Sequence, residues 1–393
     1  MTKPALRMEQ VQAPVIPIVG ELLRDNPAAI SLGQGVVSYG PPQEAIDAIS
    51  HFLRQPENHK YKLVDGIPEL KQALSEKLTN ENKISLNNES DIIVSAGSNM
   101  AFLMVLMAIA DPGDEIILLQ PYYFNHEMAA QMCNVHTVAV PTGPDYQLDL
   151  DRIHDSITAK TRAVVTVSPN NPSGAVYPPE ALASINRLCS EKGIYHISDE
   201  AYEYFCYDGV EHFSPRADSQ SAAHTISLFS LSKAYGFASW RIGYAVVPKH
   251  LVAAIKKAQD TNLICPPVIS QYAAVGALRA GRPFVEPKLA ALADVRRRVL
   301  SILSEDRNGF YTFSESKGAF YFLIQLPIET ESLGVVKKLV QEHGVATIPG
   351  SAFGLNKQCV VRISYGALDA DSVVEGVGRL RDGILQIVRN HST

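Results

Sequence analysis

Thr225-Ile-Ser-Leu-Phe-Ser230-Leu-Ser-Lys233-Ala-Tyr-Gly-Phe-Ala-Ser-Trp-Arg241-Ile-Gly243 joins an apolar run to a polar turn. The run 225–229 is typical of a buried strand, so Lys233 follows the carboxyl end of that strand. Open α/β sheets bind their ligands at this end of their strands. The hydroxyls of Ser230 and Ser232 and the guanidinium of Arg241 flank the lysine, and such donors suit an anionic phosphate beside a reactive amine.

Three interpretations of Lys233 compete. In the first, Lys233 is an ordinary solvated lysine. In the second, Ser230-Leu-Ser-Lys233 is the S-x-x-K motif of penicillin-binding proteins, but the sequence has no K-T-G motif, and Ser198-Asp199-Glu200 only approaches S-D-N. In the third, Lys233 forms a Schiff base with pyridoxal phosphate (PLP). The third interpretation predicts an acid for the pyridine nitrogen, an aromatic side chain over the ring and backbone donors for the phosphate.

Length and composition describe an ordinary globular protein. The 393 residues are 46% hydrophobic and 19% charged, with a formal net charge of −6, which offers no basic field for nucleic acid. The N-terminus lacks the apolar core of a signal peptide, and no stretch approaches the roughly 20 apolar residues of a membrane span. The five cysteines are odd in number and contain no C-x-x-C, which indicates buried thiols in a reducing compartment. We therefore expect a cytoplasmic protein.

Predicted strands and helices alternate through the middle of the chain. We expect strands near 92–95, 115–119, 135–140, 163–167, 194–197, 225–229 and 242–247. Repeated strand–helix units imply an α/β fold with a mostly parallel, seven-stranded-type sheet sandwiched by helices. Three further strands, near 319–326, 345–348 and 360–364, belong with the N-terminal arm to a smaller α+β domain. The expected division is 1–45 (arm and part of the small domain), 46–282 (large domain) and 283–393 (C-terminal small domain).

Polar side chains follow two of these strands. Asp199 comes directly after the strand at 194–197, where a carboxylate is costly without a cationic partner, and a protonated pyridine nitrogen would supply one. Tyr202 lies about one helical turn further on. Asn171 stands in a loop between two prolines, where its amide can donate to a phenolate oxygen shared with Tyr202, although asparagine before proline is also a common turn former.

Candidate ligand-binding residues also follow two other predicted strands. Tyr123 follows the strand at 115–119, and its ring can stack on a planar cofactor. The turn containing Ser98 and Asn99 precedes a buried helix and offers free N–H groups to a phosphate, although ordinary helix capping explains it equally well. The glycines around Gly35 let the backbone approach a small ligand or form a plain turn.

Taken together, these motifs resemble a known family. They are similar in order to those of the class I/II PLP-dependent aminotransferases of the aspartate aminotransferase fold type I, and most of all to the broad bacterial, kynurenine and aromatic subgroup. The resemblance covers nearly the whole chain. It rests on Ser230-Leu-Ser-Lys233 with Arg241-Ile-Gly, Asp199-Glu-Ala-Tyr202, Asn171-Pro-Ser-Gly, Ala96-Gly-Ser-Asn-Met-Ala, Tyr123, Tyr61 with Gly66-Ile-Pro-Glu-Leu, and Val361-Arg362-Ile-Ser-Tyr.

The resemblance implies a set of site residues and no metal. The expected PLP-binding residues are Ser98, Asn99, Tyr123, Asn171, Asp199, Tyr202, Ser230, Ser232, Lys233 and Arg241. The same resemblance makes Tyr61 a ligand of the cofactor phosphate in a neighbouring subunit, and therefore implies a homodimer with its active sites at the interface. Arg362 is expected to hold the substrate α-carboxylate beside Gly35 and Asn171. Lys233, Asp199 and Tyr202 are the expected catalytic residues.

The implied reaction moves an amino group from an L-amino acid to a 2-oxo acid, by resemblance 2-oxoglutarate, with ping-pong kinetics and Lys233 as proton shuttle. A carbon–sulfur β-lyase on the same fold is an alternative. A PLP-binding transcription regulator is another, but it needs a DNA-binding segment, and only about 30 residues precede the glycine segment. The family's Gly-x-Pro segment here reads Gly35-Val-Val, without the proline, and Ser239 replaces a usual glycine. The first departure bears on specificity, for which Tyr39 and Tyr122 hint at an apolar or aromatic pocket.

Overall fold

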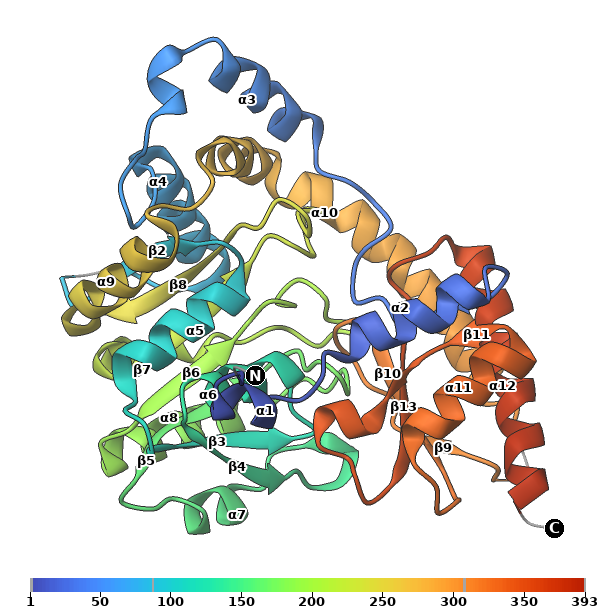
Figure 1. The fold of residues 1–393 in the computed structure, drawn as a ribbon. Coiled ribbons are helices and arrows are strands. Elements are labelled where there is room, and N and C mark those ends of the chain that lie inside the picture. The colour runs from blue at the N-terminus through green and yellow to red at the C-terminus, as the bar shows by residue number, and fades with distance from the viewer. Residues whose placement is uncertain (1–2, 87, 307–308, 392–393) are drawn as a thin grey trace.

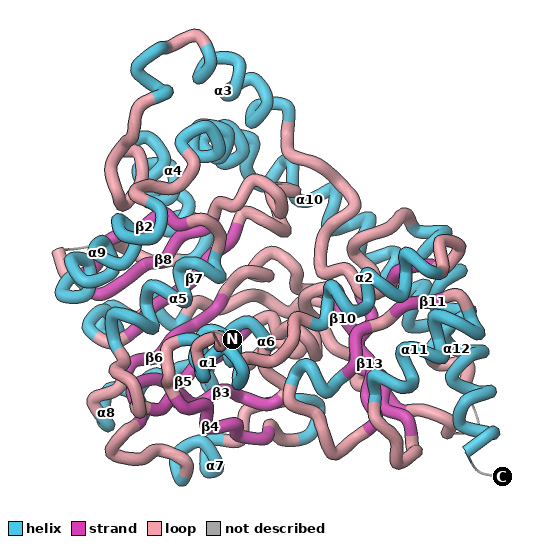
Figure 2. The backbone as a smooth tube through the Cα atoms, viewed as in Figure 1, coloured by secondary structure: helices cyan, strands magenta, loops and turns pink. Residues whose placement is uncertain are grey.

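A computed structural model describes residues 3–86, 88–306 and 309–391 and contains one large sheet (Figure 1, Figure 2). Its seven strands run in the order β2-β8-β7-β6-β5-β3-β4. Their bounds are β2 Ser90–Ser95, β3 Glu115–Gln120, β4 His136–Pro141, β5 Thr161–Val167, β6 Tyr195–Asp199, β7 Thr225–Ser230 and β8 Gly243–Pro248. All neighbours are parallel except β8, which runs antiparallel to both β2 and β7. The mostly parallel sheet predicted from the sequence is confirmed.

Helices cover both faces of this sheet, because the side chains on both faces of its central strands are buried. Ile116 and Leu118 of β3 pack with α5, α6 and α9, whereas Ile117 and Leu119 pack with α7 and α8 on the other face. The bounds of these helices are α5 Ser98–Ile109, α6 Phe124–Met132, α7 Leu150–Asp155, α8 Pro179–Lys192 and α9 Val252–Leu263. Strands buried on both faces are apolar throughout, which is why they stand out in the sequence.

The C-terminal third forms a second, smaller unit with the N-terminal segment (Figure 1). One sheet has the order β12-β13-β10-β9, and β1 pairs in parallel with β11. The bounds are β1 Ile30–Ser31, β9 Thr312–Phe313, β10 Tyr321–Leu326, β11 Val345–Ala346, β12 Ile348–Pro349 and β13 Cys359–Ser364, with helices α2 Val15–Asp25, α11 Ser332–His343 and α12 Ala370–His391. The pairing of β1 with β11 joins the two ends of the chain in one α+β unit, as expected, although the two-residue strands β1 and β9 were not predicted.

The long helix α10 (Val268–Leu303) connects the two units, because it packs against α3 (Gln43–Leu53) and α4 (Pro68–Lys77) and also against α12 of the small unit. Helix α1 (Leu6–Gln10) packs against α6. Gly281 breaks the regular geometry of α10 with φ of 54°. The expected boundary between 282 and 283 lies directly after this break and stays a prediction. Within the described residues, no helix combines the length and the apolar character needed to cross a bilayer.

Helices α3 and α10 meet so closely at Gly276 that an added Cβ would lie 2.2 Å from the backbone oxygen of Glu44. Gly276→Ala should therefore lower the free energy of unfolding by about 2 kcal/mol, because the Glu44 backbone cannot move aside as a flexible side chain could. The matched control is Gly378→Ala in α12, where nothing lies within 4 Å and alanine should add up to ~1 kcal/mol of helix propensity. Thermal unfolding midpoints measure both, and an unchanged midpoint for Gly276→Ala would contradict the packing.

Candidate active site

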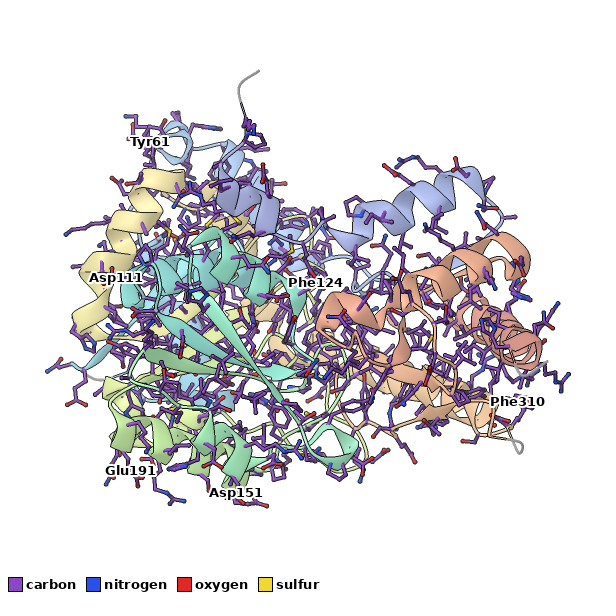
Figure 3. The ribbon with its side chains drawn as sticks, turned by 60° about the horizontal axis from the view of Figure 1, so that its bottom comes forward. Tyr61, Asp111, Phe124, Asp151, Glu191 and Phe310 are labelled. Carbon is purple, nitrogen blue, oxygen red and sulfur yellow. The ribbon has the colours of Figure 1, made fainter. Side chains whose placement is uncertain are left out.

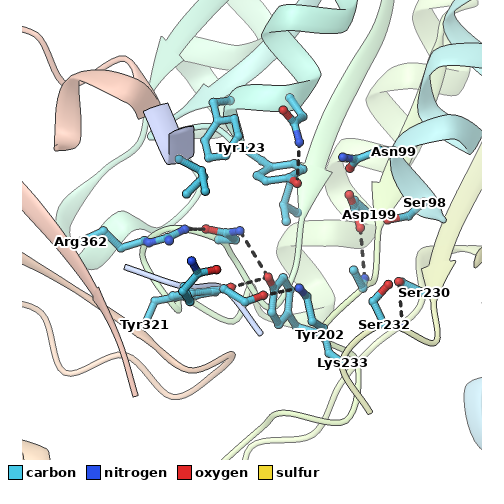
Figure 4. Close-up of a pocket in the computed structure, with 18 of the residues that line it drawn as sticks. Ser98, Asn99, Tyr123, Asp199, Tyr202, Ser230, Ser232, Lys233, Tyr321 and Arg362 are labelled. Atoms are coloured by element: carbon cyan, nitrogen blue, oxygen red, sulfur yellow. Dashed lines mark hydrogen bonds between the residues drawn. The ribbon is translucent and has the colours of Figure 1, made fainter. Parts of the chain in front are cut away.

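A cavity of about 380 Å³ lies at the carboxyl ends of the parallel strands, between the large sheet and the small unit. It is lined by all the predicted site residues except Tyr61, namely Gly35, Ser98, Asn99, Tyr123, Asn171, Asp199, Tyr202, Ser230, Ser232, Lys233, Arg241 and Arg362. Figure 4 shows that the side chains labelled there, among them Ser98, Tyr123, Asp199, Lys233 and Arg362, come from several elements and point into one space. These elements are far apart in the sequence, so the fold brings them together.

Lys233 occupies the loop that leaves β7. Its Nζ donates a hydrogen bond to the carbonyl oxygen of Gly35, and its own carbonyl oxygen accepts one from the Tyr39 hydroxyl at 3.2 Å. The pKa of Lys233 is lowered from 10.5 to about 8, mainly by burial and also by the positive charges of Arg362 and Arg241. A lysine with this pKa is partly neutral at physiological pH and can act as a nucleophile or a base.

An anion-binding corner forms where β2, β7 and β8 meet. Gly97 has φ of 84° and precedes α5, and a Cβ at this position would lie 2.3 Å from the guanidinium of Arg241. Glycine therefore allows the arginine to lie against the N-terminus of the helix. Ser98 begins the helix, and Ser230 and Ser232 add hydroxyls to the same wall. Free N–H groups, a helix dipole and a guanidinium together suit a phosphate.

Asp199 is the last residue of β6 and is buried, with 4% of its surface exposed. Nε2 of His126 lies 3.1 Å from its Oδ2, so the carboxylate has a nearby nitrogen partner. The His126 ring stacks on Phe102 at 4.1 Å and meets Tyr123 edge-on at 5.2 Å. The sequence analysis did not identify His126 as a neighbour of the site. Its spacing of three residues from Tyr123, at the start of α6, was the available signal.

A hydrogen-bonded chain crosses the cavity from Arg362 to Tyr321. Arg362 donates from Nη1 to Oδ1 of Asn171 at 2.9 Å and from Nη2 to the carbonyl oxygen of Gly33 at 2.7 Å. Nδ2 of Asn171 then donates to the Tyr202 hydroxyl at 3.3 Å, and the hydroxyls of Tyr202 and Tyr321 lie 2.6 Å apart. Burial raises the pKa of Tyr202 well above its ordinary value, so its hydroxyl stays protonated at neutral pH.

Tyr321 is a site residue that the sequence did not reveal. It lies in β10 within the apolar run Tyr-Phe-Leu-Ile, where it is indistinguishable from core. Its ring packs against the guanidinium of Arg362 at 4.5 Å, and a Cβ on Gly35 would lie 2.6 Å from its hydroxyl. Arg362 Nε has no hydrogen-bond partner within the described chain, so its N–H is among the donors that this buried guanidinium can offer to a ligand.

Three tyrosines named in the sequence analysis do not line this cavity. Tyr61 is 78% exposed and projects from the edge of the molecule (Figure 3). Tyr39 and Tyr122 do not line the cavity, so the hint that they form an apolar pocket was wrong. Tyr122 packs against Gly354, while the Tyr39 ring meets Phe284. Apolar side chains of an N-terminal segment and of the start of α6 line the cavity instead. The spacing of apolar residues in the sequence could not show that these segments lie beside the cavity.

The residues of the cavity fit PLP by the chemistry of their groups. An amine of lowered pKa, a buried carboxylate at a strand end, an anion-binding corner and the ring of Tyr123 all border one space. These are the four partners that the cofactor requires. In the part of the chain that the structure describes, no three His, Cys, Asp or Glu side chains gather to hold a metal ion.

Comparisons with known proteins agree with this arrangement. Residues 27–380 match the family model described as aminotransferase class I and II. An aromatic aminotransferase of Arabidopsis thaliana is 33% identical over 389 residues, covering 96% of this chain and 95% of that protein. An aspartate/prephenate aminotransferase of Thermus thermophilus is 37% identical over 351 residues, 88% of each chain. A solved structure of aspartate aminotransferase from Thermus thermophilus with maleate has a TM-score of 0.89 at 33% identity, covering 98% of this chain and 100% of that one.

Lys233 should titrate near pH 8 in the protein without bound ligands. Modification of residue 233 by trinitrobenzenesulfonate, followed by mass spectrometry, should rise with a midpoint close to this pH, because only the neutral amine reacts. Arg362→Met should raise the midpoint by removing a neighbouring positive charge.

The pKa of Lys233 also affects stability. The folded chain releases this proton at a lower pH than the unfolded chain, so Lys233 should make the free energy of unfolding rise between about pH 8 and pH 10.5. A modification midpoint near pH 10.5 would contradict the lowered pKa of Lys233.

Proposed function

We propose that this chain, which belongs to the class I and II aminotransferase family of PLP-dependent enzymes, moves an amino group from an L-amino acid to 2-oxoglutarate by a ping-pong mechanism. The observation that carries the proposal is the presence of Lys233, Asp199 and Arg362 in one cavity. An amine, an acid and a guanidinium from elements far apart in sequence meet there. Each has a separate role in the reaction.

Lys233 and Asp199 handle the protons. When bound, PLP accepts electrons from the substrate Cα through its ring. Asp199, with His126 at its Oδ2, keeps a proton on the pyridine nitrogen. The amine of Lys233 would hold the cofactor covalently and, when not attached to it, would carry a proton to and from the substrate Cα. Its pKa of about 8 lies near the operating pH, where a general base is most effective.

Arg362 and its neighbours orient the substrate. A guanidinium presents a planar fork to a carboxylate, and Asn171 and Gly33 hold that fork in place through Nη1 and Nη2. The unpaired Nε–H is available to the α-carboxylate. Asn171 and Tyr202 are hydrogen-bonded to each other and would lie beside the cofactor's phenolic oxygen. The phosphate would be held by Ser98, Asn99, Ser230, Ser232 and Arg241, and Tyr123 would pack on the ring.

We also propose a cytoplasmic homodimer in which Tyr61 reaches the phosphate of the partner subunit. Tyr61, Leu53, Leu63 and Ile264 are exposed, and two of them border a hollow with Leu263. A gathering of exposed apolar side chains is typical of a surface that another protein covers. The five cysteines are all unpaired, which supports a reducing compartment.

Replacing Lys233 tests the reaction. Lys233→Ala should reduce transamination by ~10⁴-fold or more, because both the covalent attachment and the proton carrier are lost. Borohydride should fix PLP to residue 233 of the natural protein, read by peptide mass spectrometry, and not to the variant. Lys249→Ala, which loses only an exposed ion pair with Asp91, is the matched control and should keep its activity. Undiminished transamination in Lys233→Ala would overturn the proposal.

Tyr61→Phe tests the contribution from the partner. Loss of one hydroxyl donor to the phosphate should raise the PLP dissociation constant by ~10-fold. Tyr195→Phe removes a surface hydroxyl that meets only His250, so it should leave this constant unchanged. Fluorescence titration measures the constant, and sedimentation at the same concentration reports the dimer. Equal constants for Tyr61→Phe and the natural protein, measured on a confirmed dimer, would remove Tyr61 from the site.

A further inference from the structure

Tyr321 reaches the cavity from the small unit and contacts Tyr202 of the large unit. It lies in β10 and is buried, and its hydroxyl is 2.6 Å from the Tyr202 hydroxyl. Its ring also packs against the guanidinium of Arg362 at 4.5 Å. In Figure 4 the side chains of Tyr202, Tyr321 and Arg362 lie next to one another. All three belong to the same chain, so a partner subunit is not needed to bring them together.

The direction of the hydrogen bonds around Tyr202 follows from the donors and acceptors of its neighbours. A guanidinium has only donors, so Asn171 presents Oδ1 to Arg362 and its amide nitrogen to Tyr202. The Tyr202 oxygen therefore accepts a hydrogen bond from Asn171, at 3.3 Å, and has one proton of its own to donate. That proton is donated either to the Tyr321 hydroxyl or to a ligand in the cavity.

The surroundings of Tyr321 make it the better donor of the two tyrosines. Burial raises the pKa of both hydroxyls, so both keep their protons at neutral pH. For Tyr321 the positive charge of Arg362 opposes the effect of burial, and its pKa rises only to about 12. The hydrogen bond between the two hydroxyls raises the pKa of Tyr202 further and lowers that of Tyr321. Tyr321 is thus the more acidic partner, as a donor to Tyr202 should be.

We propose, resting on the proposed function, that Tyr321 is a positioning residue that donates its proton to the Tyr202 oxygen and so leaves the Tyr202 proton for the phenolic oxygen of PLP. Tyr202 has a single proton, so it cannot donate to Tyr321 and to the cofactor at once. Hydrogen bonds in a chain polarise one another, so a bond from Tyr321 also makes Tyr202 a stronger donor. Tyr321 thus acts on the cofactor through Tyr202.

The test is a pH titration of the visible absorption band of the PLP-loaded enzyme without substrate. Its midpoint reports the pH at which the covalent linkage to Lys233 loses its proton. A donor at the phenolic oxygen competes with this proton for the oxygen, so a stronger donor lowers the midpoint. Tyr321→Phe keeps the ring beside Arg362 and should raise the midpoint by ~0.5 pH unit. The matched control Tyr365→Phe removes another buried hydroxyl of the small unit, which does not line the cavity, and should leave the midpoint unchanged.

A double-variant cycle shows whether Tyr321 acts through Tyr202. Tyr202→Phe should raise the midpoint by ~1 pH unit, and adding Tyr321→Phe to it should cause no further change. An unchanged midpoint in Tyr321→Phe, or an equal shift in both backgrounds, overturns the role of Tyr321. A lowered midpoint also overturns it, because it would mean that Tyr202 had been donating to Tyr321. If PLP forms no visible band with the natural protein, the proposed function is overturned instead.

Discussion

The site depends on a buried guanidinium. Arg362 is 2% exposed, and a charge so far from water requires partners. It finds them in the carbonyl oxygen of Gly33 and the amide oxygen of Asn171, which come from the N-terminal segment and from the loop after β5. The contact with Asn171 joins the small unit to the large one, and the contact with Gly33 holds the guanidinium within the small unit. The packing of the two units thus helps to set the position of the arginine that is proposed to bind the substrate.

The charges in the cavity explain why the protein suits anionic ligands. Lys233, Arg241 and Arg362 outnumber Asp199, and mutual repulsion adds to burial in lowering the pKa of Lys233. A phosphate and a carboxylate would relieve this repulsion on binding. Ligands that bind only the folded chain also stabilise it, so we expect the loaded enzyme to resist unfolding better than the empty one.

The antiparallel strand β8 has a specific consequence for the phosphate corner. Because β8 pairs between β2 and β7 and starts at Gly243, the loop from 231 to 242 closes at the same edge as the end of β2. Lys233 and Arg241 are thereby brought to the amino end of α5. A Cβ at Gly243 would lie 2.6 Å from the backbone nitrogen of Ser98, so the approach needs a residue without a side chain.

The sequence by itself determined the α/β class, the mostly parallel sheet and the strand-end candidates, including Lys233 and Asp199. These follow from local pattern, because a strand buried on both faces is apolar throughout and its first polar residue marks the ligand-binding edge. Their catalytic roles stay predictions. Only the tertiary structure decided that Tyr321 and Ile16 reach the cavity and that His126 lies against Asp199. Each lies inside an element whose pattern is that of ordinary core or helix, and what it touches depends on which distant segments pack against it.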